Sequence, residues 1–192
     1  MVAASTRRHL RPLGHRTGPR RPGPPDPCLE ALSRQARARL RLFVYGTLKQ
    51  GERNHDRFCR GVTKVEEATV RGRLYDLPFG FPALVVPEED VHAVGTGDYL
   101  ADAELPHSIR VGEPEDLAGW DVVHGELMTF VDPAERLPRI DGLERFRPGA
   151  ESFYTRVLLP VTPTRRGQTV LAWAYSIGEG SGVHLPMGVW PG

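Results

Sequence analysis

The sequence contains few of the residues from which covalent cross-links and metal centres are built. Only two cysteines occur in 192 residues: Cys28 near the N-terminus, and Cys59 in a region expected to be helical. They form no disulfide framework. The seven histidines show no spacing typical of metal ligands. We therefore predict no metal site, and a reducing compartment, the cytoplasm, is the expected location.

Long apolar runs and an excess of one charge are also missing. No uninterrupted apolar stretch is long enough to span a membrane, and the N-terminus lacks the apolar segment of a secretory signal. The formal net charge is +1, so the bulk charge indicates neither a nucleic acid nor a membrane as a partner. Glycine motifs that bind phosphates or dinucleotides are absent. We expect no cofactor.

The first 39 residues differ in composition from the rest. They are rich in Arg, Pro and Gly and lack apolar periodicity, so we predict a disordered leader over 1–39, with a short helix over about 27–39. One alternative is that the folded protein begins near Leu40 and that the leader has no specific role. Another is a transit peptide, but the prolines disfavour the amphipathic helix that such a peptide needs. Residues 40–192 suit one compact domain.

A polar, acidic segment from about residue 88 to 120 interrupts this domain. It carries many more acidic than basic side chains and has little apolar periodicity. Segments of this kind without regular structure are often functional loops. We predict a long insertion that forms either a loop or a lid.

Alternating and continuous apolar stretches predict many short strands. They are expected over 42–45, 67–77, 83–86, 122–130, 154–161 and 169–176. Helices are expected over about 54–59 and from Asp132 to Leu143, where Asp132 can cap and Pro133 can occupy the first helical position. This pattern favours a mixed α+β fold, a small closed or half-closed barrel.

The stretch from Leu42 to Gly51 has the most informative local pattern. Apolar residues run into Tyr45, Gly46 permits a tight turn, and Thr47 can cap a helix. A helix that begins at such a turn directs unpaired N–H groups at an anion. The pattern is consistent with a strand, an anion-binding turn and a short helix, or with an ordinary connection that binds nothing.

This stretch, followed by Asn54 and His55, resembles the opening signature of the gamma-glutamylcyclotransferase-like family, which includes AIG2-like and butirosin-cyclotransferase-like proteins. Four later segments resemble further elements of that family in the same order: 123–127, 140–144, 153–159 and 172–175. The resemblance covers about residues 42–178 and omits the leader and the acidic segment. It implies a small, mostly antiparallel β-barrel flanked by a few short helices.

Glu144 is the principal catalytic candidate. It follows an apolar helical stretch, and an acid half-buried there would have a raised pKa and could act as a base near neutral pH. A solvated glutamate at a helix end is the alternative. The resemblance assigns Glu144 the role of general acid/base. Asp141 lies on the same helical face and could raise the pKa of Glu144, cap the helix or pair with Arg145. We favour a structural role.

The resemblance also implies the reaction. The α-amino group of a γ-glutamyl amide attacks its own γ-carbonyl, which releases 5-oxoproline and a free amine. Backbone N–H groups of Gly46, Thr47 and Leu48 would hold the α-carboxylate.

Three tyrosines complete the predicted substrate-binding set. Tyr45, Tyr154 and Tyr175 match the family's motifs, and core packing is the alternative for each. Arg156 shares a strand face with Tyr154 and is either a substrate contact or a structural ion-pair partner. We interpret Asn54 and His55 as packing or hydrogen-bonding residues, and Trp190 as packed on the barrel.

The sequence therefore predicts a gamma-glutamylcyclotransferase, a transferase or lyase whose partner is a small γ-glutamyl molecule. The acidic segment would favour a cationic leaving amine if it faced the substrate; a solvated loop is the alternative that we prefer. The alternatives are a non-catalytic member that binds a small carboxylate, or an acyltransferase that uses the same pocket. The oligomeric state is not predicted.

Overall fold

In the computed structural model, the described residues are 32–33, 35–109, 111–112, 119–165, 167–180 and 182–191. Residues 32–33 and 35–37 are helical, as predicted for the end of the leader, while the remainder of the leader lies outside the described residues. The division of the chain at residue 40 stays a prediction. Among the described helices, none is both long and apolar enough to cross a membrane.

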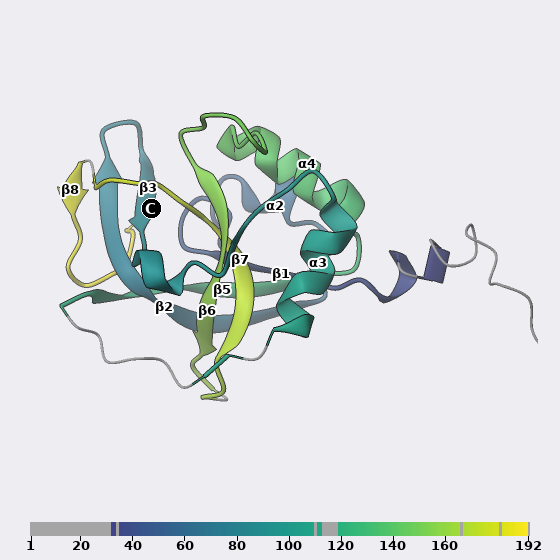
Figure 1. The fold of residues 1–192 in the computed structure, drawn as a ribbon. Helices are drawn as coiled ribbons and strands as arrows, with labels where there is room; N and C mark the ends of the chain where they lie inside the picture. The colour runs from purple at the N-terminus through teal and green to yellow at the C-terminus, as the bar shows by residue number, and fades with distance from the viewer. Residues whose placement is uncertain are drawn as a thin grey trace, which may run out of the picture.

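Five strands form a closed barrel (Figure 1). They are β1 (Leu40–Val44), β2 (Lys64–Leu77), β5 (Asp121–Phe130), β6 (Thr155–Pro163) and β7 (Val170–Ser176). The order around the barrel is β2-β5-β1-β7-β6, and pairing of β6 with β2 closes it. Only β1 and β7 are parallel to one another within this ring. The predicted fold class, a small and mostly antiparallel barrel with short helices, is confirmed.

The long strand β2 extends beyond the barrel and carries two additional strands. Its distal end pairs with β3 (Phe81–Val85) on one side and with β8 (Val183–His184) on the other. A further short strand, β4 (Ala93–Val94), pairs with β6. The extension therefore places the turn between β2 and β3 outside the barrel, where it can border a cavity.

Alternation along the strands divides the core into two clusters. Side chains of one cluster, which includes Phe43, Val70 and Val157, come from the barrel strands and from segments that pack on them. The neighbours on the opposite strand face, such as Leu42, pack under the helices together with Leu137. The barrel interior and the helical layer are therefore filled by alternate residues of the same strands.

The helical layer consists of α2 (His55–Phe58), α3 (Tyr99–Ser108) and α4 (Pro133–Glu144), and a single-turn helix η1 (Glu88–Asp90) follows β3. In Figure 1, α3 and α4 lie together on one side of the barrel. The predicted helix after Asp132 is confirmed as α4, with Pro133 in its first turn. The expected side-chain cap is not: the Asp132 carboxylate accepts hydrogen bonds from Arg136 instead.

The expectation of a loop over the acidic segment is wrong for residues 99–108, which form α3. The Asp98 carboxylate caps this helix by accepting a hydrogen bond from the N–H of Ala101. Asp102 is buried, and its backbone oxygen accepts a hydrogen bond from the indole of Trp173. Because the buried positions of α3 include an aspartate and a proline, apolar periodicity could not indicate this helix.

Candidate active site

A cavity of about 520 Å³ lies where β1 ends. It is bordered by the turn after β1, the turn between β2 and β3, the last residue of α4 and the residues that precede β6. Every residue of the predicted site lines it: Tyr45, Gly46, Thr47, Leu48, Glu144, Tyr154 and Tyr175. Their roles stay predictions.

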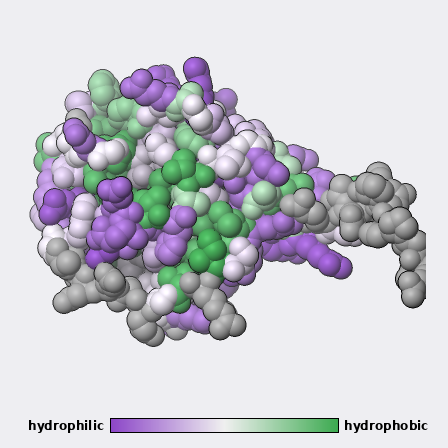
Figure 2. All heavy atoms as spheres, viewed as in Figure 1, coloured by the Kyte–Doolittle hydropathy of each residue, from purple (hydrophilic) through white to green (hydrophobic). Residues whose placement is uncertain are grey.

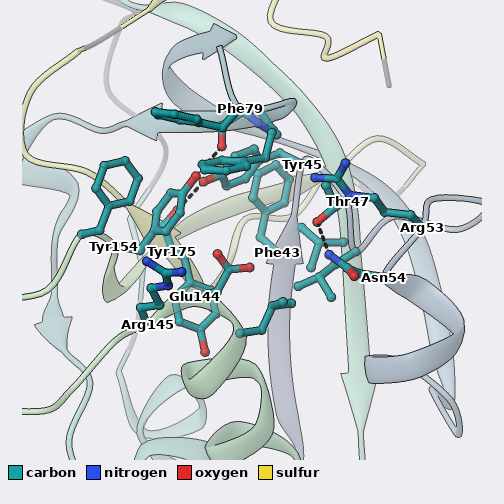
Figure 3. A pocket seen from close by; sticks show the side chains of 17 residues that line it. Phe43, Tyr45, Thr47, Arg53, Asn54, Phe79, Glu144, Arg145, Tyr154 and Tyr175 are labelled. Carbon is teal, nitrogen blue, oxygen red and sulfur yellow. Dashed lines mark hydrogen bonds between the residues drawn. The ribbon is translucent and has the colours of Figure 1, made fainter. Parts of the chain in front are cut away.

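Glu144 is the last residue of α4, and its side chain is only partly exposed. Figure 3 shows its carboxyl group pointing into the cavity. No described residue donates a hydrogen bond to this carboxylate or forms an ion pair with it. Burial raises the pKa of Glu144 from 4.5 to about 7. The group can therefore exchange a proton close to neutral pH.

Asp141 anchors the last turn of α4 from the opposite side. Its carboxylate accepts hydrogen bonds from the Tyr175 hydroxyl at 2.6 Å and from Arg156 Nε at 2.9 Å. Burial raises the pKa of Asp141, while the Tyr175 hydrogen bond and the Arg156 charge lower it part of the way. The pairing with Arg145 considered from the sequence is replaced by one with Arg156, and Asp141 has the structural role that the sequence favoured.

Arg156 is fully buried. It forms ion pairs with Asp141 at 2.9 Å and with Asp102 at 3.0 Å, and it does not line the cavity. Of the two alternatives, the structural ion pair is correct and the substrate contact is wrong. Tyr154 lies immediately before β6 and lines the cavity. It packs in the same core cluster as Leu158 and Trp173, and the Arg156 guanidinium lies over the Trp173 ring, so the side chains of Tyr154 and Arg156 are on the same side of the strand, as the alternation predicts.

The three tyrosines donate their hydroxyl hydrogens to protein groups. Tyr45 donates to the backbone oxygen of Tyr175 at 2.7 Å, and Tyr154 to that of Pro82 at 2.6 Å. Burial is the main cause that raises the pKa of Tyr45, Tyr154 and Tyr175 above its ordinary value. The tyrosines therefore stay protonated and shape the walls of the cavity.

Residues 46–54 form successive turns rather than the helix that the sequence suggested. The backbone oxygen of Thr47 accepts a hydrogen bond from the N–H of Asn54, and the Asn54 amide donates to the Thr47 hydroxyl. The His55 ring contacts the backbone oxygen of Leu48 at 3.0 Å. Asn54 and His55 are thus hydrogen-bonding residues, as interpreted from the sequence.

The N–H groups of the turn stay available to a ligand. Among the described residues, none accepts a hydrogen bond from the N–H of Thr47 or Leu48. Gly46 is required for the close approach of β3, because a Cβ atom there would lie 2.5 Å from Pro82 Cγ. The anion-binding turn is consistent with this geometry, but it contains no helix N-terminus.

Sequence reasoning assigned no site role to several other residues that line the cavity. They include Arg53, Phe79, Phe81, Arg145 and Phe153. The rings of Phe79 and Phe81 stack with centroids 5.9 Å apart, and Phe81 meets Phe153 edge-on at 6.5 Å. The prolines and the glycine of segment 78–82 are typical of a turn, and no local pattern marks its two phenylalanines as cavity residues.

No described residue of the acidic segment lines the cavity. The described part of the segment therefore adds no side chain to the cavity wall, and the lid stays a prediction. Trp190 packs on the barrel as expected, and its indole donates a hydrogen bond to Asp76.

Comparison with known proteins agrees with the motifs that the sequence contains. The family model "Gamma-glutamyl cyclotransferase, AIG2-like" matches residues 42–107 and 109–191. A protein from Niallia circulans, named gamma-L-glutamyl-butirosin B gamma-glutamyl cyclotransferase, is 27% identical over 135 residues, which is 70% of this chain. The match spans 64% of that relative's length.

Two solved structures are also similar. YkqA from Bacillus subtilis has a TM-score of 0.48 and 20% identity, over 79% of this chain and 39% of that chain. An AIG2-like protein from Mus musculus has a TM-score of 0.46 and 19% identity, over 75% of this chain and 80% of that chain.

Proposed function

Because this chain belongs to the gamma-glutamyl cyclotransferase, AIG2-like family, we propose that it is an enzyme that converts a γ-glutamyl amide into 5-oxoproline and a free amine. The observation that carries the proposal is the state of Glu144: a partly buried carboxyl, without a described partner, in a cavity and with a pKa of about 7. The name of the Niallia circulans relative supports a γ-glutamyl compound as the substrate class.

The reaction is an internal acyl transfer. The α-amino nitrogen of the glutamyl group forms a bond to its own γ-carbonyl carbon, and the bond from that carbon to the amide nitrogen breaks. The atoms of the substrate are all recovered in 5-oxoproline and the amine, so water is not consumed. Because the nucleophile belongs to the substrate, the protein has to fold the substrate into the reactive conformer and move protons.

Glu144 performs the proton transfers in this proposal. Its carboxylate removes a proton from the α-ammonium group, which frees the nitrogen to attack, and its carboxylic acid then protonates the departing nitrogen. A pKa of about 7 suits both steps, because the protonated and ionised forms are then similar in free energy near neutral pH.

The turn after β1 would hold the other end of the glutamyl group. The N–H groups of Thr47 and Leu48 are available, and hydrogen bonds from Asn54 to Thr47 fix the turn. Backbone N–H groups bind carboxylates well, and they keep the substrate α-carboxylate away from Glu144. The tyrosine rings then limit the conformations that the glutamyl chain can adopt in the cavity.

The test is an assay for 5-oxoproline with a panel of γ-glutamyl amides and the variant Glu144→Gln. We expect product from the native protein and a rate at least about 100-fold lower from the variant, with binding of the amide retained in calorimetry. Glu135→Gln is the matched control, because Glu135 is exposed on the same helix and should keep full activity.

Two results would contradict the proposal. Binding of amides without any product from the panel would favour the non-catalytic carboxylate-binding protein. Transfer of the γ-glutamyl group to an added amine, without 5-oxoproline, would favour the acyltransferase.

A further inference from the structure

Two exposed aromatic side chains stand at the opening of the cavity. Phe79 and Phe153 retain 73% and 53% of their accessible surface, although both line the cavity. Phe81 lies between them, stacked on one and edge-on to the other. Exposed apolar surface that borders a cavity is typical of a surface that a ligand covers. The arrangement of these rings suits a flat apolar group.

Arg145 stands beside this aromatic surface in an unusual conformation. Its φ is 55°, and among the described residues no other residue except glycine has a positive φ. Glycine is the residue favoured at such a helix end, so an arginine is accommodated there at a cost. Its side chain is exposed, lines the cavity and has no described hydrogen-bond or ion-pair partner. Its charge is therefore free to meet a ligand.

The charges around the cavity favour an anion on the ligand. The charged lining residues are Arg53, Glu144 and Arg145, and Figure 3 shows the two arginines on opposite sides of Glu144. One N–H group of Arg53 donates to the backbone oxygen of Gly80 at 2.8 Å, which fixes the side chain near Phe79. Since the only acid is the proposed base, a cationic amine would meet two guanidinium groups and no free acid.

We propose that the amine released here carries both an aromatic ring and a carboxylate, as phenylalanine does. Its ring would pack on Phe79, Phe81 and Phe153, and its carboxylate would pair with Arg145. This inference rests on the proposed function, since it concerns the leaving half of the same substrate. The glutamyl end would lie toward Thr47 and Leu48. For γ-glutamyl-phenylalanine, the amide bond to the phenylalanine nitrogen breaks, the new bond from the α-nitrogen closes 5-oxoproline, and the phenylalanine nitrogen receives the proton.

The experiment compares ligands that differ in one group. Binding of γ-glutamyl-phenylalanine, γ-glutamyl-phenethylamine and γ-glutamyl-putrescine to Glu144→Gln is measured by calorimetry. The first two share the ring and differ in the carboxylate, and the third replaces both by a cation. We expect the phenylalanine compound to bind at least about 10-fold more tightly than the phenethylamine compound, and the putrescine compound to bind most weakly.

Arg145→Gly in the same background identifies the residue responsible. Glycine suits a φ of 55°, so this variant should fold at least as stably, which thermal unfolding checks. We expect it to bind the phenylalanine and phenethylamine compounds equally. Arg147→Gln is the matched control, because Arg147 is an exposed arginine that does not line the cavity, and it should keep the preference.

Failure of this inference can be told from failure of the proposed function. Equal binding of the two aromatic compounds, or a preference that Arg145→Gly retains, would overturn it even if 5-oxoproline is formed. An equal loss of affinity for both compounds in Arg145→Gly would indicate that the arginine binds the glutamyl carboxylate. That result would also overturn the inference. The expected preference without any turnover would uphold the ligand and contradict the reaction.

Discussion

The carboxylate of Asp141 accepts a hydrogen bond from the guanidinium of Arg156 at 2.9 Å, in the protein interior and three residues before Glu144. Arg156 also pairs with Asp102 of α3, so one buried cation joins α3, α4 and β6. Because a removed partner would leave a buried charge unpaired, the two pairs hold the last turn of α4 in one position. Glu144 is therefore presented to the cavity from a fixed helix end.

Asp141→Asn should destabilise the protein substantially. The substitution keeps the shape of the side chain but leaves Arg156 with one carboxylate, and we expect a loss of about 3 kcal/mol in the free energy of unfolding. Asp132→Asn is the control, since Asp132 forms its ion pair with Arg136 at a partly exposed site, and it should cost about 1 kcal/mol or less. Urea unfolding measures both, and similar losses would contradict the argument.

Gly46→Ala should impair substrate binding. A Cβ atom would lie 2.5 Å from Pro82 Cγ and 2.8 Å from Pro82 Cδ, so the turn and β3 would have to separate, which would displace the N–H groups of Thr47 and Leu48. We expect KM for a γ-glutamyl amide to rise about 10-fold or more. In Gly142→Ala, the control on α4, the new atom has no neighbour within 4 Å. An unchanged KM in Gly46→Ala would show that the turn does not hold the substrate.

The rate should depend on pH through Glu144. Burial raises the pKa of this carboxyl to about 7, and the ionised form is needed to accept the first proton. We therefore expect kcat/KM to rise with pH up to about 7 and to level off above it. A rising limb near pH 4.5, the ordinary value of the pKa, would contradict the assignment of the base.

The stability of Glu144→Gln should exceed that of the native protein at high pH. The folded state has the higher pKa, about 7 against 4.5, so it binds the proton more tightly and its stability falls as the pH rises between these values. Glutamine does not ionise, so the stability of the variant does not fall with pH for this reason. We expect the variant to be more stable by on the order of 2 kcal/mol above pH 7, since partial exposure reduces the full effect, and by almost nothing below pH 4.5. Unfolding at both pH values, with Glu135→Gln as the control, measures the difference.

Periodicity in the sequence was sufficient for most of the barrel. β2 was expected over 67–77 and occupies Lys64–Leu77, with Ala68, Val70 and Leu74 buried as the alternation indicated. One face of such a strand is buried and the other is more exposed, so the alternation of apolar and polar residues identifies the strand and its buried face. α3 was missed because its buried side chains include Asp102, whose charge is balanced by Arg156 from a distant strand.

The site was only partly accessible to the same reasoning. The motifs that contain Tyr45, Glu144 and Tyr154 placed those residues around one cavity. Arg145 and Phe79 carry no local signal of their own, since an arginine after a helix and a phenylalanine in a turn are common. Their meaning comes from a left-handed backbone conformation and from exposure beside a cavity, and only the structure shows these.

In the proposed reaction, the substrate's own nitrogen, activated by Glu144, attacks the γ-carbonyl. The most direct test is to identify the acid produced from γ-glutamyl-phenylalanine in water labelled with heavy oxygen. Cyclisation predicts 5-oxoproline without the label, in an amount equal to the phenylalanine released, and its formation at least about 100-fold more slowly by Glu144→Gln. Glutamate that carries the label would show that water attacks the carbonyl and would contradict the account.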